Sequence, residues 1–212
     1  MELRPSTIEI FDEKIKNKER GIYSSLKRVL DLLVSVSSLI IVVPIILVTS
    51  LLIILESPGN PFYVQKRMGL MGKEFNLIKL RSMRLDAEKK GAQWAEKDDP
   101  RITRIGKFIR KTRIDELPQI FNVIRGDMAI IGPRPERKIF VEEFTKTIPN
   151  FPKRLEVNPG LTGWAQVNGG YEITPKDKLE LDLFYIDNRN VLMDLKIILL
   201  TFQVIFTGEG AR

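Results

Sequence analysis

One long apolar segment constrains this chain more than any other feature of its sequence. Leu32–Leu55 is a run of 24 residues without a charge, bounded by Asp31 and Glu56. A helix of that length reaches across the roughly 30 Å hydrocarbon core of a bilayer. The run is too long for a cleavable signal peptide, and no small-residue cleavage site follows it. The segment therefore predicts a helix that stays in the membrane.

The segment fits two arrangements, a straight signal-anchor helix or a re-entrant hairpin. Span length alone favours the straight helix. Pro44 favours the hairpin, because a central proline removes a backbone hydrogen bond and kinks a helix. The flanks favour it too, since Lys and Arg prefer the cytoplasmic side and stand at both ends. These basic residues are Lys14, Lys16, Lys18, Arg20, Lys27 and Arg28 before the run, and Lys66, Arg67, Lys73, Lys79 and Arg81 after it.

The length of each half also fits a hairpin. About 12 residues on either side of Pro44 reach roughly 18 Å, which is enough for one leaflet and not for two. We expect Ser37 and Ser38 to help satisfy the carbonyls that the kink leaves free.

Composition limits the chemistry that the rest of the chain can perform. There is no Cys and no His, which excludes disulfides, thiolate sites, the Ser-His triad and the usual zinc ligands. Carboxylates, Lys, Arg, hydroxyl groups and hard cations remain. A net charge of +7 points to phosphate-bearing partners.

Short extended and helical patterns follow the apolar segment. Residues 61–65 and 75–80 read as strands around a glycine turn, and residues 157–170 read as a loop. Residues 101–111 predict a basic amphipathic helix, which suits either a headgroup layer or a solvated face of a core helix. Helices are also predicted over residues 115–125, ending at Gly126, and over the apolar residues 195–206.

Adjacent carboxylates stand at the start of the predicted helix over residues 115–125. Asp115 and Glu116 fit ordinary N-terminal capping. In a basic, His-free chain they also fit a magnesium site that bridges to phosphate oxygens, with one carboxylate free to attack phosphorus.

An arginine between two prolines is the next unusual feature. Pro133 and Pro135 fix the backbone around Arg134, which would present its planar fork in one pose to a phosphate. The alternative is a proline-rich turn with a solvated arginine. Lys79 and Arg81 form a weaker phosphate-binding signal, and Asp194 fits a helix cap before the last apolar run.

Several common motifs are absent. The chain has no P-loop, no dinucleotide-binding glycine motif and no Asp-x-Asp triplet. These absences argue against the common nucleotide-dependent architectures.

Read in order, the motifs resemble the monotopic phosphoglycosyl transferases, the bacterial sugar transferase family that starts glycoconjugate assembly on polyprenyl phosphate. The resemblance covers the chain from about Lys27 to its C-terminus. It rests on the basic start and proline-centred apolar segment, and then on residues 75–83, 113–119, 122–127, 132–135 and 159–169. One departure is Val43, because the family often has Ser before the hairpin proline.

The resemblance implies a reaction and the residues that perform it. A sugar-1-phosphate would pass from a UDP-sugar to polyprenyl (undecaprenyl) phosphate through a covalent aspartyl intermediate, releasing UMP and initiating exopolysaccharide, O-antigen or glycoprotein glycan assembly. Asp115 would be the nucleophile and Glu116 its partner at Mg²⁺, with Lys79, Arg134 and Asp194 in the active site. Membrane lipids would be further partners and nucleic acid would not; a second copy of the chain and downstream glycosyltransferases are left open.

The implied fold is α+β and mostly helical, with a re-entrant membrane helix hairpin and a small cytoplasmic catalytic domain that has interfacial amphipathic helices. The corresponding parts are a polar extension (1–26), the re-entrant helix (27–56) and the catalytic domain with its C-terminal apolar helix (57–212). The implied location is the cytoplasmic face of the bacterial inner membrane.

Two other functions fit parts of the sequence. A non-catalytic, membrane-anchored module that binds anionic lipid or nucleic acid would explain the charge and the apolar segment. It would not explain the paired carboxylates. A metal-dependent phosphohydrolase of lipid diphosphates would differ only in using water as the acceptor.

Overall fold

The computed structural model describes residues 21–87, 99–169 and 173–207, and this part of the chain is mostly helical with two small sheets. The N-terminal extension expected over residues 1–26 therefore lies largely outside the described residues. The elements, with η for 3-10 helices, are α2 (Ile22–Glu56), β1 (Phe62–Met68), η1 (Leu70–Gly72), β2 (Glu74–Leu80), α3 (Arg104–Lys111), η2 (Ile114–Gln119), α4 (Ile120–Arg125), β3 (Ala129–Ile131), α5 (Lys138–Thr147), η3 (Phe151–Glu156), β4 (Gly160–Thr162), α6 (Trp164–Asn168), α7 (Pro175–Asn188) and α8 (Val191–Thr207).

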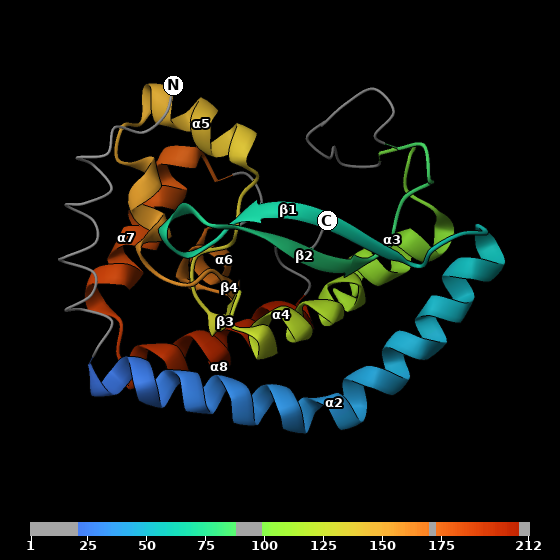
Figure 1. Cartoon of the computed structure of the whole chain (residues 1–212), viewed down its shortest axis with the longest axis horizontal. Coiled ribbons are helices and arrows are strands. Elements are labelled where there is room, and N and C mark those ends of the chain that lie inside the picture. The colour runs from blue at the N-terminus through green and yellow to red at the C-terminus, as the bar shows by residue number, and fades with distance from the viewer. Residues whose placement is uncertain (1–20, 88–98, 170–172, 208–212) are drawn as a thin grey trace.

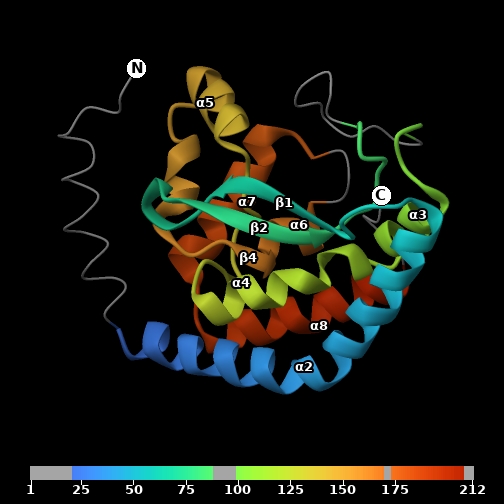
Figure 2. The same cartoon turned by 45° about the vertical axis from the view of Figure 1, so that its right-hand side comes forward.

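The apolar segment forms one continuous helix, α2, of 35 residues with Pro44 inside it. By length and composition it is the one helix in the described part of the chain that could cross a membrane. Its axis changes direction near the middle, and the helix runs along one side of the molecule (Figure 1 and Figure 2). A bend at this place is what an internal proline causes.

The serines before the bend do not act as the sequence suggested. Ser37 donates to the carbonyls of Leu33 and Val34, at 2.8 and 3.1 Å, and Ser38 donates to the carbonyl of Ser35 at 2.8 Å. Pro44 frees the carbonyl of Ile40, four residues before it. The expectation that these hydroxyls satisfy the freed carbonyl was wrong, because serine in a helix reaches back three or four residues.

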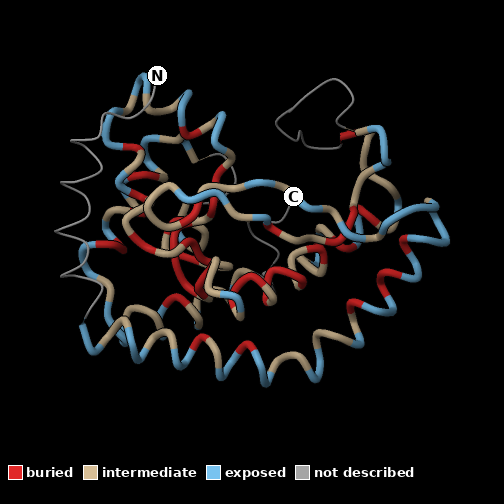
Figure 3. Tube along the Cα trace, viewed as in Figure 1, coloured by how far each residue is buried: buried red, intermediate tan, exposed pale blue. Residues whose placement is uncertain are grey.

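The buried face of α2 is more polar than its exposed face, the reverse of a helix on the surface of a water-soluble protein. The inner face, buried against the rest of the molecule, contains Asp31, Ser35, Thr49 and Ser50 besides two isoleucines (Figure 3). Large apolar side chains are exposed on the other face, with Ile40 at 81%. In water this arrangement would be unfavourable, so α2 has the distribution expected of a helix with lipid on its outer side.

Each sheet has two strands. β1 and β2 are antiparallel, with Phe62 opposite Leu80 and Met68 opposite Glu74, and they lie close to the two strands that the sequence predicted around a glycine turn. β3 and β4 are parallel, and a Cβ added to Gly160 would lie 2.1 Å from the nitrogen of Gly132. The loop prediction for residues 157–170 was wrong here, because its pairing partner lies about 30 residues earlier in the chain.

The predicted helices are present near their expected positions, but not always as the expected type of helix. The segment over residues 115–125 is the 3-10 helix η2 followed by α4, which ends at Gly126 with φ of 95°. α3 begins at Arg104, with the Thr103 side chain accepting from the Gly106 nitrogen at 2.9 Å. Ile102 is outside it and pairs with Met83. α8 begins four residues before the predicted start, and α5 and α7 were not predicted.

A shared apolar core attaches α2 to the elements that carry the paired carboxylates. Ile46 and Ile53 of α2 are buried with Leu80 and Ile109. Ile105, Ile114, Leu117 and Phe121 pack against this cluster. The amphipathic helix α3 thus uses Ile105 and Ile109 for the core, while Phe108 is 59% exposed.

Candidate active site

The paired carboxylates belong to the short 3-10 helix η2. The residue before it, Arg113, adopts a left-handed conformation with φ of 57°, and Pro118 lies inside the helix. Asp115 is buried. Because η2 is fastened to the core through Ile114 and Leu117, both carboxylates are held in fixed positions.

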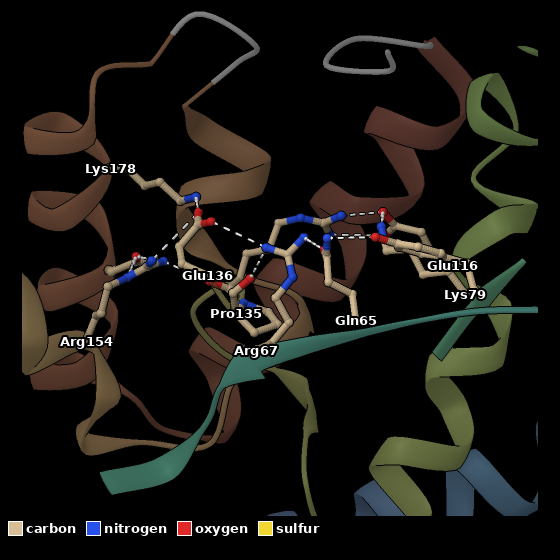
Figure 4. A network of polar contacts seen from close by, with 11 residues as sticks. Gln65, Arg67, Lys79, Glu116, Pro135, Glu136, Arg154 and Lys178 are labelled. Atoms are coloured by element: carbon tan, nitrogen blue, oxygen red, sulfur yellow. Dashed lines mark hydrogen bonds and ion pairs between the residues drawn. The ribbon is translucent and has the colours of Figure 1, made fainter. Parts of the chain in front are cut away.

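Glu116 accepts from two cations that come from distant parts of the chain (Figure 4). Lys79 Nζ lies 3.1 Å from Glu116 Oε1, and Arg134 Nη1 lies 3.1 Å from Oε2. Arg134 Nη2 completes a two-pronged contact with Oε1. Burial alone would raise the pKa of Glu116, but the Arg134 and Lys79 charges outweigh burial and hold this pKa well below its ordinary value.

Asp115 behaves in the opposite way although it is the next residue. Burial raises the pKa of Asp115 to about 6; Lys79 opposes the rise and the Glu116 charge adds to it. The carboxylate is ionised at neutral pH but poorly solvated, since the nearest cations form their ion pairs with Glu116. Poor solvation and a raised pKa both favour its use as a nucleophile.

The loop that carries Arg134 is held by its carbonyl groups. Four consecutive carbonyls, from Pro133 to Glu136, each accept one hydrogen bond. The donors, in that order, are Gly160 N at 2.9 Å, Arg154 Nη2 at 3.0 Å, Arg67 Nη1 at 3.1 Å and Met68 N at 2.8 Å. Pro133 and Pro135 have no N–H group, so each can be held through its backbone only by its carbonyl. This gives the Arg134 side chain a rigid base.

A second group of buried charges lies next to this loop. Glu136 pairs with Lys178 Nζ, and with Arg67 and Arg154 at 3.6 and 3.8 Å. Arg154 also pairs with Asp182 at 2.6 Å, and both side chains are only 2% exposed. Burial would raise the pKa of Glu136, but Lys178 and Arg154 lower it to about 2. The sequence does not reveal this cluster, because its members are spread over more than 100 residues.

Asn122 was also missed as a site residue. It is fully buried, and its amide accepts from Ile78 N at 3.1 Å and donates to the carbonyl of Asn76 at 2.8 Å. Both partners are on the edge of β2 that β1 does not cover. Asn122 therefore binds α4 to β2, and so holds Lys79 beside η2.

Among the described residues, Arg81 and Asp194 form their hydrogen bonds with groups other than the carboxylate pair. Arg81 is buried and donates to the carbonyls of Ser57 and Pro58 just after α2, although it also lines the cavity described below. Asp194 accepts from Tyr23 at 2.8 Å, Lys27 at 3.2 Å and Tyr185 at 3.0 Å. Among the described residues that line the cavity, Asp194 does not appear. Its contacts attach the start of α2 to α7 and α8.

The start of α2 also contacts the helix that follows the carboxylates. Arg28 Nη1 and Nη2 donate to the carbonyls of Val123 and Ile124, at 2.6 and 2.9 Å. Both carbonyls belong to the last turn of α4, where a cation is favourable, and that of Val123 also accepts from Gly126 N at 3.1 Å. At the other end of α2, Glu56 accepts from the backbone nitrogens of Arg104 and Ile105. Both ends of α2 are thus bound to the same folded unit.

One cavity of about 550 Å³ contains the carboxylates, Lys79 and Arg134. It is strongly cationic, which suits a substrate with several phosphate charges. Its other polar and aromatic lining residues include Gln65, Arg67, Arg84, Arg101, Arg110, Arg113, Glu136, Phe140, Phe144, Gln166 and Lys178.

The expected magnesium ion can be tested against the donor atoms of this cavity. The described residues contain no cluster of three or more acidic side chains that could hold a metal by themselves. Magnesium in phosphate-processing enzymes is often held by one or two carboxylates together with substrate phosphates. Asp115 and Glu116 fit that pattern, but Glu116 already shares both oxygens with Lys79 and Arg134. Asp115 forms no ion pair among the described residues, so it is the carboxylate that would hold a further cation.

Comparison with known proteins identifies the family. The model of the bacterial sugar transferases matches residues 22–208. The chain belongs to the bacterial sugar transferase family. The match includes α2, both carboxylates and the Arg134 loop.

Similar members of the sugar transferase family differ in length. An Aeromonas hydrophila UDP-N-acetylgalactosamine-undecaprenyl-phosphate N-acetylgalactosaminephosphotransferase is 46% identical over 194 residues, which are 90% of this chain and 46% of that protein. A putative undecaprenyl-phosphate N-acetylgalactosaminyl 1-phosphate transferase of Bacillus subtilis is 59% identical over 133 residues, 63% of this chain and 74% of the relative. An Escherichia coli UDP-glucose:undecaprenyl-phosphate glucose-1-phosphate transferase is 37% identical over 196 residues, 90% of this chain and 42% of the relative. The chain thus spans less than half of two of these three proteins.

Proposed function

We propose that this protein transfers a sugar-1-phosphate from a UDP-sugar to polyprenyl phosphate through a covalent intermediate on Asp115. The observation that carries the proposal is the contrast inside η2. Glu116 is neutralised by Lys79 and Arg134, whereas burial raises the pKa of Asp115 to about 6. A carboxylate of this kind in a cationic cavity is suited to attack phosphorus.

The reaction consists of two displacements at one phosphorus. An Asp115 oxygen forms a bond to the β-phosphorus of the UDP-sugar, and the bond from that phosphorus to the bridging oxygen breaks, releasing UMP. An oxygen of polyprenyl phosphate then attacks the same phosphorus and frees Asp115. Neither nucleophile needs a strong base, because both are ionised near neutral pH, which fits a chain without histidine.

The cations of the site would offset the negative charge that both steps bring together. Lys79 and the rigid Arg134 fork lie beside the attacking carboxylate and would contact the phosphoryl oxygens. A magnesium ion, held by Asp115 and the donor phosphates, would supply further neutralisation of the diphosphate. We expect EDTA to stop turnover and magnesium to restore it. Full turnover in EDTA would remove the metal from the proposal.

Trapping the intermediate is the decisive test. Enzyme mixed with UDP-sugar labelled in the sugar, without polyprenyl phosphate, should release one UMP per active site and keep the label on a peptide that contains Asp115. Adding polyprenyl phosphate should move the label to the lipid, and water alone should not. UMP release without labelled protein would contradict the covalent route, and rapid transfer to water would instead indicate a phosphohydrolase.

The sugar that we propose for the donor is N-acetylgalactosamine. It is the sugar in the names of the Aeromonas and B. subtilis relatives, which are 46% and 59% identical to this chain. The E. coli relative named for glucose is 37% identical. A panel of UDP-sugars, read by UMP release, should give the highest kcat/KM for UDP-N-acetylgalactosamine. A higher value for UDP-glucose would overturn this choice.

We also propose that α2 enters the membrane from the cytoplasmic face of the inner membrane and returns to it. A straight spanning helix would separate its ends by the bilayer. Here Arg28 near one end and Glu56 at the other both bind the same folded unit, and the exposed apolar face lies between them. Val43 precedes the kink without a hydroxyl group, so Pro44 and this packing would maintain the bend.

Cysteine accessibility tests this topology. Single cysteines placed at Lys18 and at Gly72 should both resist an impermeant reagent in intact cells and react after permeabilisation. Labelling of the position 18 cysteine alone from outside would indicate a straight spanning helix. Pro44→Ala should shift molecules towards that form and lower turnover. Wild-type topology and turnover in this variant would show that the proline is incidental.

A further inference from the structure

The two ends of the cavity are built from different parts of the molecule. The α2 end, defined here by Arg84, Arg110 and Arg113, adjoins segments whose apolar residues pack against Ile46 and Ile53 of α2. The α7 end, defined by Glu136, Phe140 and Lys178, adjoins a different core cluster. That cluster is centred on Val141, Phe151 and Leu179, and it contains no residue of α2.

Glu116, the neighbour of Asp115 in the chain, lies apart from the α7 end of the cavity. In Figure 4 Lys178 and Glu136 stand at one side of a row of polar contacts, and Glu116 and Lys79 stand at the other. Arg67 and Gln65 lie between them and line the same cavity. A substrate bound at Asp115 can therefore extend past Gln65 and Arg67 towards the α7 end.

The chemistry of the two ends differs. Arginines dominate the α2 end, which suits phosphate groups. The α7 end combines an ion pair, Glu136 with Lys178, with the rings of Phe140 and Phe144, whose centroids are 6.3 Å apart. The side chains of Glu136 and Lys178 keep 10% and 20% of their surface exposed. Charged hydrogen-bonding groups beside aromatic faces suit a neutral, hydroxyl-rich ligand better than a phosphate.

The order of the proposed reaction decides which ligand group takes which end. In phosphoryl transfer the attacking and leaving oxygens lie roughly in line with phosphorus. UMP leaves from the side opposite Asp115, and in the second step polyprenyl phosphate must attack from that same side. The lipid comes from the membrane, so this side opens to the α2 end. The sugar stays bonded to phosphorus throughout and must occupy another direction.

We propose that the α7 end of the cavity is the sugar subsite, with Glu136, Phe140 and Lys178 as specificity-determining residues, and that UMP and polyprenyl phosphate share the α2 end in turn. This inference rests on the proposed function. It assigns the donor sugar to the end of the cavity whose core cluster contains no residue of α2.

Variants at each end separate the two roles. Lys178→Gln should change the ratio of kcat/KM for UDP-N-acetylgalactosamine over UDP-glucose by about tenfold, the scale of one or two lost pocket contacts. It should leave the dissociation constant of UMP, measured by calorimetry, within about twofold of wild type. Phe140→Leu should shift the same ratio and is a milder change at a partly exposed position. Arg110→Gln should instead raise the UMP dissociation constant and the KM for polyprenyl phosphate together, with the sugar ratio unchanged.

A control variant on the same helix tests whether these effects are specific to the cavity. Ile139→Ala, on the same helix as Phe140 but 54% exposed and outside the cavity lining, should change none of these quantities. Weaker UMP binding in Lys178→Gln or Phe140→Leu, without a changed ratio, would place the nucleoside at the α7 end and overturn the assignment. An unchanged ratio in both variants would overturn it as well. If no UDP-sugar labels the wild-type enzyme, the proposed function fails; if labelling occurs at Asp115 and the ratios do not shift, only the subsite assignment fails.

Discussion

Asp115 and Glu136 are both buried carboxylates in one cavity, yet their surroundings drive them in opposite directions. Glu136 contacts Lys178, Arg67 and Arg154, and its pKa is lowered to about 2. The ion pairs near Asp115 go to its neighbour Glu116, and burial raises the pKa of Asp115 to about 6. Burial alone destabilises a charge, and direct ion pairing reverses the effect. Its ion pairs therefore stabilise the charge of Glu136, whereas the Asp115 carboxylate is suited to reacting.

The largest expected effect is on Asp115. Asp115→Asn should lower the rate of both half-reactions by about 10⁴-fold or more, because the amide cannot attack phosphorus. The same variant should be at least as stable to heat as wild type, since it removes an unfavourable buried charge. Rapid-quench labelling and thermal unfolding in detergent measure the two quantities. Retained labelling would contradict the proposed nucleophile, and a large loss of stability would mean that Asp115 resembles Glu136 after all.

For the Glu136 cluster we expect the reverse pattern, in which a replacement lowers the stability of the folded protein. Arg154→Met should lower the free energy of unfolding by about 3–5 kcal/mol, because it leaves the charge of Asp182 buried without its partner. Thermal and denaturant unfolding measure this loss. Lys138→Met is the control, since its pair with Glu142 is 3.9 Å long, more than half exposed and expected to contribute little. Equal stability of the two variants would show that the buried cluster is not a structural support.

Arg134 connects the Glu136 cluster with the ion pairs of Glu116, so its replacement tests how the two differ. Its loop is held beside Glu136, while its side chain donates hydrogen bonds to Glu116. Arg134→Lys keeps the charge but loses the planar fork, so kcat should fall by roughly 10²-fold. Steady-state UMP release measures the change, and thermal stability should stay near wild type. Near-normal kinetics would reduce Arg134 to a solvated loop residue.

The smallest expected effect is the pH dependence. The first half-reaction should slow about tenfold per pH unit below about 6, where Asp115 becomes protonated. The stability of the folded protein should change with pH in the opposite direction to the rate. A folded pKa above the unfolded value of about 3.9 means that the contribution of Asp115 is present at low pH and is lost as pH rises through about 6.

Glu136 is the internal comparison for this titration. Its folded pKa of about 2 lies below the unfolded value of about 4.3, so its contribution is present above that value and is lost only as pH falls through about 2. Burst rates of UMP release from pH 5 to pH 8 should show the Asp115 titration and no sign of Glu136. A flat rate over this range would remove the raised pKa from the mechanism, and the Asp115→Asn variant should lose the corresponding part of the pH dependence of stability.

The sequence alone was sufficient where the signal lies within a few neighbouring residues. The long apolar run predicted α2, the short extended piece over residues 75–80 predicted β2, and Gly126 correctly marked the end of the helix that follows the carboxylates. It failed where backbone hydrogen bonding depends on a distant partner. β3 and β4 are three residues each and exist only as a pair, and η2 became a 3-10 helix rather than the start of an α-helix.

Residue types determined which groups are present for chemistry, and the tertiary structure decided what each group does. A chain without Cys or His had to rely on carboxylates, Lys and Arg, and adjacent acids beside a proline-flanked arginine could be found in the sequence. The sequence does not tell which of the two acids is neutralised by ion pairs, because Lys79, Glu116 and Arg134 come from separate elements. In the same way, Arg81 caps the end of α2 and Asp194 holds its start. Ion pairs act over a few ångströms in space, and only the packing of α2, β2 and the Arg134 loop brings these charges within that distance.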